Sequence, residues 1–193
     1  MSFFELVKNN RSCRRFDNSV KLDQNMVKEF IDLARMSASA GNMQPLKYIL
    51  SIDDRKNEEI FSCLKWAAYL KDWQGPEPLE RPSSYIVILG DKSIAENFWC
   101  DHGIAAQTIL LGARDKGFAG CIFAAINHPK LKKVLSIADN FEILLVIAIG
   151  KPLETAKIEK VKPDEDIKYF RDDDLVHHVP KRALNDIIIS IYS

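Results

Sequence analysis

The pattern of apolar and polar positions predicts helices that alternate with short strands. Apolar side chains three and four residues apart share one face of a helix, and they recur in several segments. The predicted helices are residues 3–10, a helix capped by Asp23, one from Asp53 or Asp54 to about residue 64, residues 95–115, and a short helix capped by Asn127. The segment 95–115 is apolar on most sides, which predicts a central, buried helix.

Runs of β-branched and aromatic residues predict about four strands, at 47–52, 85–89, 117–126 and 142–149. Residues 154–176 are charged, lack periodicity and are long for a connection without regular structure, so we expect them to cross a surface or a partner. Residues 179–193 become apolar again. The unequal connections favour an α+β sandwich, in a single domain over residues 1–193, rather than a regular series of strand–helix–strand units.

Composition narrows the classes of partner. The 193 residues are 47% hydrophobic and 28% charged, and 27 Lys and Arg balance 27 Asp and Glu. No overall field therefore favours nucleic acid or a membrane surface, and any anion site must be built locally. No segment approaches the roughly 20 apolar residues of a membrane span, and the first residues do not resemble a signal peptide. We expect a cytoplasmic protein.

Several familiar sites are missing from the sequence. There is no GxG pair for a dinucleotide, no phosphate loop with its lysine, no GxSxG and no HExxH. The four cysteines form no CxxC, and the adjacent His177 and His178 cannot share a helix face. We therefore predict no metal site and interpret the histidines as a chance pair in a charged loop.

The segment after the first predicted helix concentrates cations. Residues 11–16 hold Arg11, Arg14, Arg15 and the hydroxyl of Ser12. Arginine forks match phosphate oxygens, and a serine hydroxyl adds a neutral donor. The alternative is that these cations only neutralise the carbonyl end of the preceding helix.

Three further clusters offer binding groups, each with a plainer alternative. Residues 39–45 present the amides of Asn42 and Gln44, which suit the edge of a heteroaromatic ring, or else form a capped turn. Residues 117–122 place small residues in a strand, where a flat ligand or a crossing helix can approach the main chain. Residues 180–182 carry a cationic pair that is otherwise a solvated surface.

Taken in this order, the four clusters resemble those of the FMN-dependent nitroreductase family over nearly the whole chain. The family's motifs map onto Arg11, Ser12 and Arg14 with Arg15 adjoining, Ser39, Asn42, Gln44, Pro45, Gly120, Cys121, Lys181 and Arg182. The resemblance implies that these residues bind FMN. It also implies a three-layer α/β/α sandwich with a mainly antiparallel sheet of four to five strands, in an intertwined homodimer whose residues 154–193 wrap the partner subunit with FMN at the interface.

The resemblance further implies an activity. FMN would pass hydride from NADH or NADPH to a nitroaromatic, a quinone or a related small-molecule acceptor in ping-pong order, with no catalytic side chain. Similar sequences perform reductive dehalogenation or flavin cleavage, so another flavin reaction is an alternative. A redox sensor that binds flavin without turnover, or a dimeric scaffold whose arginines are surface charge, is the non-enzymatic alternative.

Overall fold

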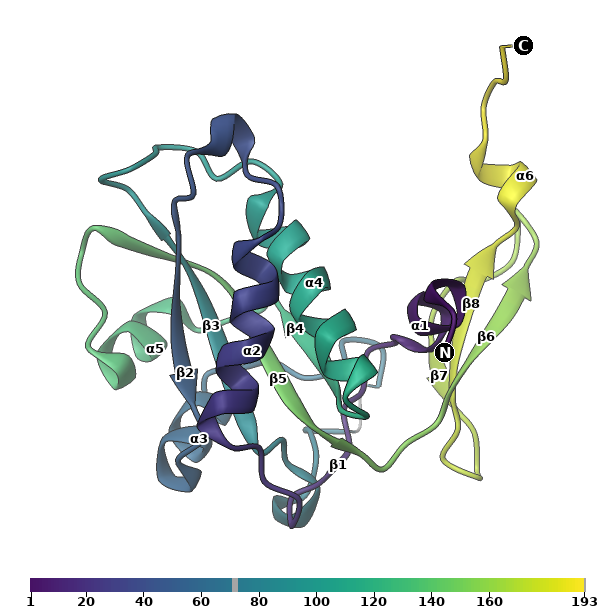
Figure 1. Ribbon diagram of the computed structural model, residues 1–193. Helices are drawn as coiled ribbons and strands as arrows, with labels where there is room; N and C mark the ends of the chain where they lie inside the picture. Colours follow the sequence, from purple (N-terminus) through teal and green to yellow (C-terminus); the bar gives the residue numbers. More distant parts are fainter. Residues whose placement is uncertain (71–72, 193) are drawn as a thin grey trace.

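A five-stranded antiparallel sheet forms the centre of the protein (Figure 1). This computed structural model describes residues 1–70 and 73–192. The strands are β1 (Phe16–Asp17), β2 (Leu46–Ser51), β3 (Ser84–Asp91), β4 (Ala119–Phe123) and β5 (Phe141–Pro152). They run in the order β1-β5-β3-β2, and β4 also pairs with β5. The predicted α+β class and antiparallel sheet are confirmed.

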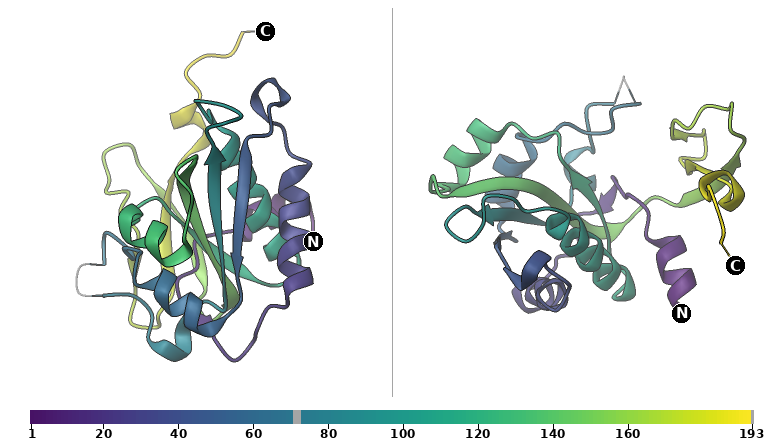
Figure 2. Two further views of the ribbon diagram at one scale, coloured as in Figure 1. Left: turned by 90° about the vertical axis from the view of Figure 1, so that its left-hand side faces the viewer. Right: turned by 90° about the horizontal axis from the view of Figure 1, so that it is seen from above.

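Helices cover both faces of this sheet and make three layers (Figure 2). One face carries α2 (Gln24–Arg35) and α4 (Asp101–Asp115), and the other carries α3 (Asp54–Phe61) and α5 (His128–Leu135). The central strand β3 is buried on both sides, because Ile86 and Ile88 pack toward α4 while Val87 and Leu89 pack toward α3. The core is thus two apolar layers that share one sheet.

The predicted helix starts are confirmed by their caps. The side chains of Asp23, Asp53 and Asn127 each accept a hydrogen bond from a backbone N–H of the first turn, at 2.9, 2.8 and 3.2 Å. Such a bond satisfies a donor that the helix itself leaves unpaired. The first helix, α1 (Phe3–Asn9), begins in the same way at Ser2.

The long central helix is shorter than predicted. It begins at Asp101 rather than near residue 95, and Trp99 just before it has a left-handed φ of 45°. The preceding Phe98 lies against Gly90 of β3, where a Cβ would come within 2.3 Å of its ring. The chain therefore leaves the helical path to place this aromatic side chain on the sheet.

An arm extends from the body on the side of α1 (Figures 1 and 2). It holds β6 (Ala156–Val161) and β7 (Phe170–Arg171), both paired with β8 (His177–Arg182), and it continues into α6 (Leu184–Ile187). We expected residues 154–176 to lack regular structure. This expectation is wrong in part, because β6 lies in this segment and pairs with β8. Two 3₁₀ turns, Ala40–Asn42 and Pro78–Glu80, complete the regular structure, and no helix in the described residues is long and apolar enough to cross a bilayer.

Candidate functional site

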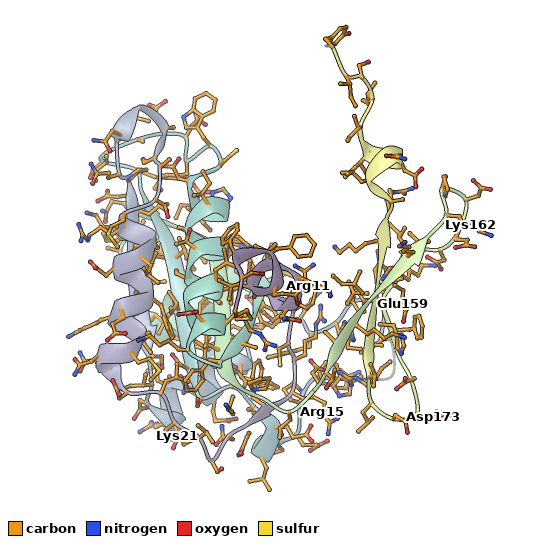
Figure 3. All side chains as sticks on the ribbon, turned by 45° about the vertical axis from the view of Figure 1, so that its right-hand side comes forward. Arg11, Arg15, Lys21, Glu159, Lys162 and Asp173 are labelled. Atoms are coloured by element: carbon orange, nitrogen blue, oxygen red, sulfur yellow. The ribbon has the colours of Figure 1, made fainter. Side chains whose placement is uncertain are left out.

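A cavity of about 340 Å³ lies where the segment after α1 meets the arm. Figure 3 shows Arg11 at this place, between α1 and the arm. We call this cavity the cationic pocket. Its walls are Asn10, Arg11, Ser12, Arg14, Gln107, Leu110, Ile122, Tyr169, His177, Val179 and Lys181.

The segment of residues 12–15 contributes two side chains to the pocket. The N–H of Cys13 donates to the carbonyl of Gly120 at 2.9 Å, which fixes this segment beside β4. Ser12 and Arg14 line the pocket, whereas Cys13 is buried and Arg15 is bound to Glu80.

Arg14 is the most deeply placed cation of the pocket, with an exposed fraction of 8%. Its Nη1 lies 3.2 Å from Nε2 of His177, and its guanidinium carbon lies 4.7 Å from the ring centre of Tyr169. Among the described residues, its Nε has no partner, and no carboxylate oxygen lies within 4 Å of the guanidinium. A buried charge without a counter-ion is costly, so this position favours an anion.

Arg11 and Lys181 add two further positive charges. Nη2 of Arg11 donates to the carbonyl of Val7 at the end of α1, at 2.9 Å, and burial lowers the pKa of its guanidinium. Within the part of the chain that the structure describes, neither Arg11 nor Lys181 forms an ion pair. Three cations thus border one cavity without a carboxylate to neutralise them.

The neighbouring cations of the predicted set are committed elsewhere. Arg15 forms two hydrogen bonds with Glu80, at 2.7 and 2.5 Å, and these bonds lower the pKa of Glu80. Arg182 follows Lys181 on β8, so it faces the other side of the strand, where its Nη1 donates to the carbonyl of Pro163 at 3.4 Å. The structure places Lys181, but neither Arg15 nor Arg182, in the cationic pocket.

Gly120 and Cys121 of β4 lie beside the pocket. A Cβ at Gly120 would stand 2.3 Å from the carbonyl oxygen of Ala148, so only glycine fits this close approach of two strands. The thiol of Cys121 is buried, and burial raises its pKa although the nearby Arg14 cation opposes the shift. A buried neutral thiol packs and does not act as a nucleophile.

The turn at residues 39–45 is anchored to the start of α4. The hydroxyl of Ser39 donates to Asp101 at 2.6 Å and accepts from the backbone N–H of Gln44 at 2.9 Å. Asn42 and Gln44 are exposed with left-handed φ values of 54° and 53°, and Pro45 is buried. The turn therefore presents its amide side chains to solvent from a fixed backbone.

This turn and the cationic pocket lie on different parts of α4. The turn borders a separate cavity of about 230 Å³ and is tied to Asp101, whereas the pocket is lined by Gln107 and Leu110. Six to nine residues of helix separate these positions by about 9 to 14 Å. A single copy of the chain thus does not bring Ser39, Asn42, Gln44 and Pro45 into the cationic pocket.

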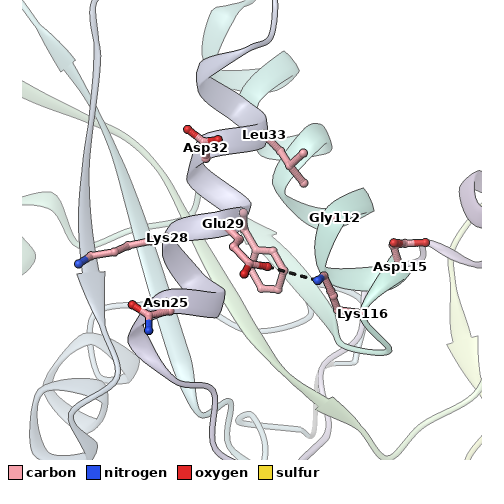
Figure 4. Close-up of a pocket in the computed structure, with 9 residues that line it drawn as sticks. Asn25, Lys28, Glu29, Asp32, Leu33, Gly112, Asp115 and Lys116 are labelled. Carbon is pink, nitrogen blue, oxygen red and sulfur yellow. Dashed lines mark ion pairs between the residues drawn. The ribbon is translucent and has the colours of Figure 1, made fainter.

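A larger cavity, about 650 Å³, lies between α2 and α4 (Figure 4). Its rim mixes both signs of charge, and Glu29 and Lys116 form an ion pair across it at 3.3 Å. None of the sequence-predicted site residues lines it. The lining holds three carboxylates against two lysines, so it offers no excess of positive charge for an anion, and size alone does not make it the better candidate.

Comparison with known proteins decides the family. Residues 7–151 match the Nitroreductase family. The chain belongs to this family. The Bacillus subtilis (strain 168) protein MhqN, provisionally named an NAD(P)H nitroreductase, is 24% identical over 190 residues, which cover 77% of this chain and 88% of the relative. The chain is accordingly an oxidoreductase of the nitroreductase type.

Solved structures have the same fold. A nitroreductase family protein from Clostridium novyi NT is 26% identical with a TM-score of 0.67, over 79% of this chain and 87% of its own. A family protein from Streptococcus pneumoniae TIGR4 is 18% identical with a TM-score of 0.71, over 98% and 100%. A protein from Clostridium difficile R20291, described as an FMN-dependent nitroreductase, is 20% identical with a TM-score of 0.65, over 90% and 94%. The structures from Streptococcus pneumoniae and Clostridium difficile bear on the fold alone.

The sequence prediction for this nitroreductase missed His177 and Tyr169. His177 is a buried residue of β8 with an exposed fraction of 1%, so its interpretation as part of a charged loop is wrong. The alternation of β8 puts His177, Val179 and Lys181 on one face, toward the pocket. The sequence contains this alternation, but residues 180–182 were interpreted only as a cationic pair and no strand was predicted there.

Proposed function

We propose that this protein is an FMN-dependent NAD(P)H oxidoreductase that reduces a small acceptor such as a nitroaromatic or a quinone. The observation that carries the proposal is the cationic pocket, in which Arg11, Arg14 and Lys181 lack carboxylate partners among the described residues. When bound there, FMN supplies the hydride chemistry, with donor and acceptor used in turn, and the protein supplies position and charge.

The residues present fit the phosphate end of such a cofactor. A phosphate group carries nearly two negative charges at neutral pH, which matches the three cations, and Ser12 offers a hydroxyl donor. The volume of about 340 Å³ lies near the lower end for ligand pockets, so it suits the phosphate and the sugar-like chain rather than the whole cofactor. A cation near the ring would also stabilise negative charge on the reduced flavin.

We infer that a second copy of the chain completes the site in a homodimer. In one copy the amides of Asn42 and Gln44 lie away from the cationic pocket, although the resemblance assigns them to the same cofactor. The chain also exposes apolar surface that a partner would cover. The exposed residues include Phe3 at 72%, Phe4 at 74%, Ile189 at 99% and Ile191 at 79%. Residues 1–193 then form one domain whose arm, 154–193, wraps the partner.

The test of the proposed function uses the purified full-length protein. We expect it to bind FMN and to be yellow, and we expect its visible absorbance to bleach when NADH or NADPH is added without oxygen. Addition of a quinone or nitroaromatic should then give steady consumption of the nicotinamide. Protein that binds no FMN contradicts the proposal, and protein that is reduced once without turnover points to a redox sensor. Product analysis separates acceptor reduction from dehalogenation or flavin cleavage.

A further inference from the structure

His177 contacts both Arg14 and Tyr169. The imidazole is 1% exposed, its ring centre lies 5.1 Å from that of Tyr169, and its Nε2 lies 3.2 Å from Nη1 of Arg14. A guanidinium has only donors, so Nε2 is the acceptor of this hydrogen bond and the ring proton resides on Nδ1. Arg14 and His177 come from opposite ends of the chain, 163 residues apart.

The nearby carboxylate of Glu154 does not bind the side chain of Arg14. Glu154 accepts from the backbone N–H of Arg14, and its other oxygen pairs with Arg171 at 2.8 Å. Arg171 in turn stacks over Trp73, with its guanidinium carbon 4.9 Å from the ring centre. Glu154 therefore fixes the backbone of Arg14 and leaves its side chain to His177 and Tyr169.

The imidazole of His177 can hold the Arg14 guanidinium without reducing its positive charge, because the ring stays neutral. Burial and, after it, the adjacent Arg14 cation lower the pKa of His177 to about 4, although the carboxylate of Glu154 opposes the shift. A neutral ring accepts a hydrogen bond from Arg14 without competing with a bound anion for the positive charge. A carboxylate in its place would neutralise the guanidinium and weaken the anion site.

We propose that His177 is a positioning residue for Arg14. It binds Nη1 of the guanidinium, so that the N–H groups without a partner among the described residues face the cationic pocket and a phosphate oxygen there. This inference rests on the proposed function, because it assigns His177 to the grip on the cofactor's phosphate and not to its ring.

The experiment compares FMN with riboflavin, which has the same ring but no phosphate. Dissociation constants are measured by flavin fluorescence for the wild type, Arg14→Ala, His177→Ala and the double variant. We expect His177→Ala to weaken FMN binding about threefold to thirtyfold and to leave riboflavin binding unchanged. The double variant should bind FMN no more weakly than Arg14→Ala alone, because His177 acts through that arginine.

His177→Gln provides the matched control. Its amide oxygen can reach the position of Nε2, so we expect this variant to recover most of the FMN affinity, and thermal unfolding verifies that each variant is folded. Three results would overturn the inference about His177 but not the proposed phosphate site. They are equal weakening of FMN and riboflavin binding in His177→Ala, additive losses of FMN affinity in the double variant, and full FMN affinity in His177→Ala while Arg14→Ala binds FMN weakly. Wild-type protein without FMN affinity, or Arg14→Ala with unchanged FMN affinity, would overturn the proposed phosphate site as well.

Discussion

Arg14 and Arg15 are adjacent in sequence but are predicted to have separate roles. The side chain of Arg14 borders the cationic pocket without a carboxylate partner among the described residues. That of Arg15 is held by Glu80 through two hydrogen bonds. Replacing each by alanine removes the same charge at nearly the same place in the chain, so overall electrostatics change equally. Any difference in cofactor affinity between the two variants then reports direct contact.

The expected magnitude follows from the lost interactions. A hydrogen bond to a charged group contributes about 1.5 to 3 kcal/mol, so Arg14→Ala should raise the Kd for FMN by roughly tenfold to a hundredfold. Arg15→Ala should leave that Kd within about twofold. It breaks a partly buried pair whose side chains are 18% and 25% exposed, so it should instead lower the free energy of unfolding by about 1 to 3 kcal/mol.

Fluorescence titration with FMN and chemical denaturation measure these two effects on the same preparations. Raising the ionic strength should weaken FMN binding by the wild type more than by Arg14→Ala, because one charge contact fewer is left to screen. Equal losses of affinity in the two variants, or a larger loss in Arg15→Ala, would refute the assignment of Arg14 to the anion site.

Two further predictions concern the scaffold. Gly120→Ala should lower the free energy of unfolding by about 1 to 3 kcal/mol, because its Cβ would meet the carbonyl oxygen of Ala148; an unchanged melting temperature would contradict the close approach. His178 lies 2.9 Å from Asp172 and 2.8 Å from Glu159, and hydrogen bonds to these carboxylates raise its pKa above 6.5. The protonated ring therefore stabilises the arm fully below pH 6.5, and this stabilisation is lost as the pH rises through the raised pKa. Hydrogen exchange of the β8 amides should accelerate over that range, and an NMR titration of His178 with a pKa at or below 6.5 would contradict it.

The features that could be predicted from the sequence depend on local interactions. Each helix start rests on one side chain that caps a nearby N–H, as at Asp23 and Asn127, and a cap is readable over three residues. The strands β2, β3, β4 and β5 are apolar enough to identify without their partners, whereas the two-residue strand β1 was not predicted. The fold class followed from these elements together with the resemblance to the family.

The features that could not be predicted depend on contacts distant in sequence. Arg14 and Arg15 look alike until the chain folds and brings Glu80, 65 residues away, to one of them. His177 gains its role only from Arg14. The strands of the arm were missed for the same reason, since β6 is charged and becomes a strand by pairing with β8. Local sequence thus identified the cations, and the tertiary structure selected among them.

The most direct test of the central claim is a crystal structure of the protein with FMN bound. The account predicts the phosphate in the cationic pocket, within hydrogen-bond distance of Arg14 and close to Arg11 and Lys181, with Asn42 and Gln44 of the partner subunit at the ring. A phosphate bound elsewhere, with the guanidinium of Arg14 still facing an empty cavity, would contradict it.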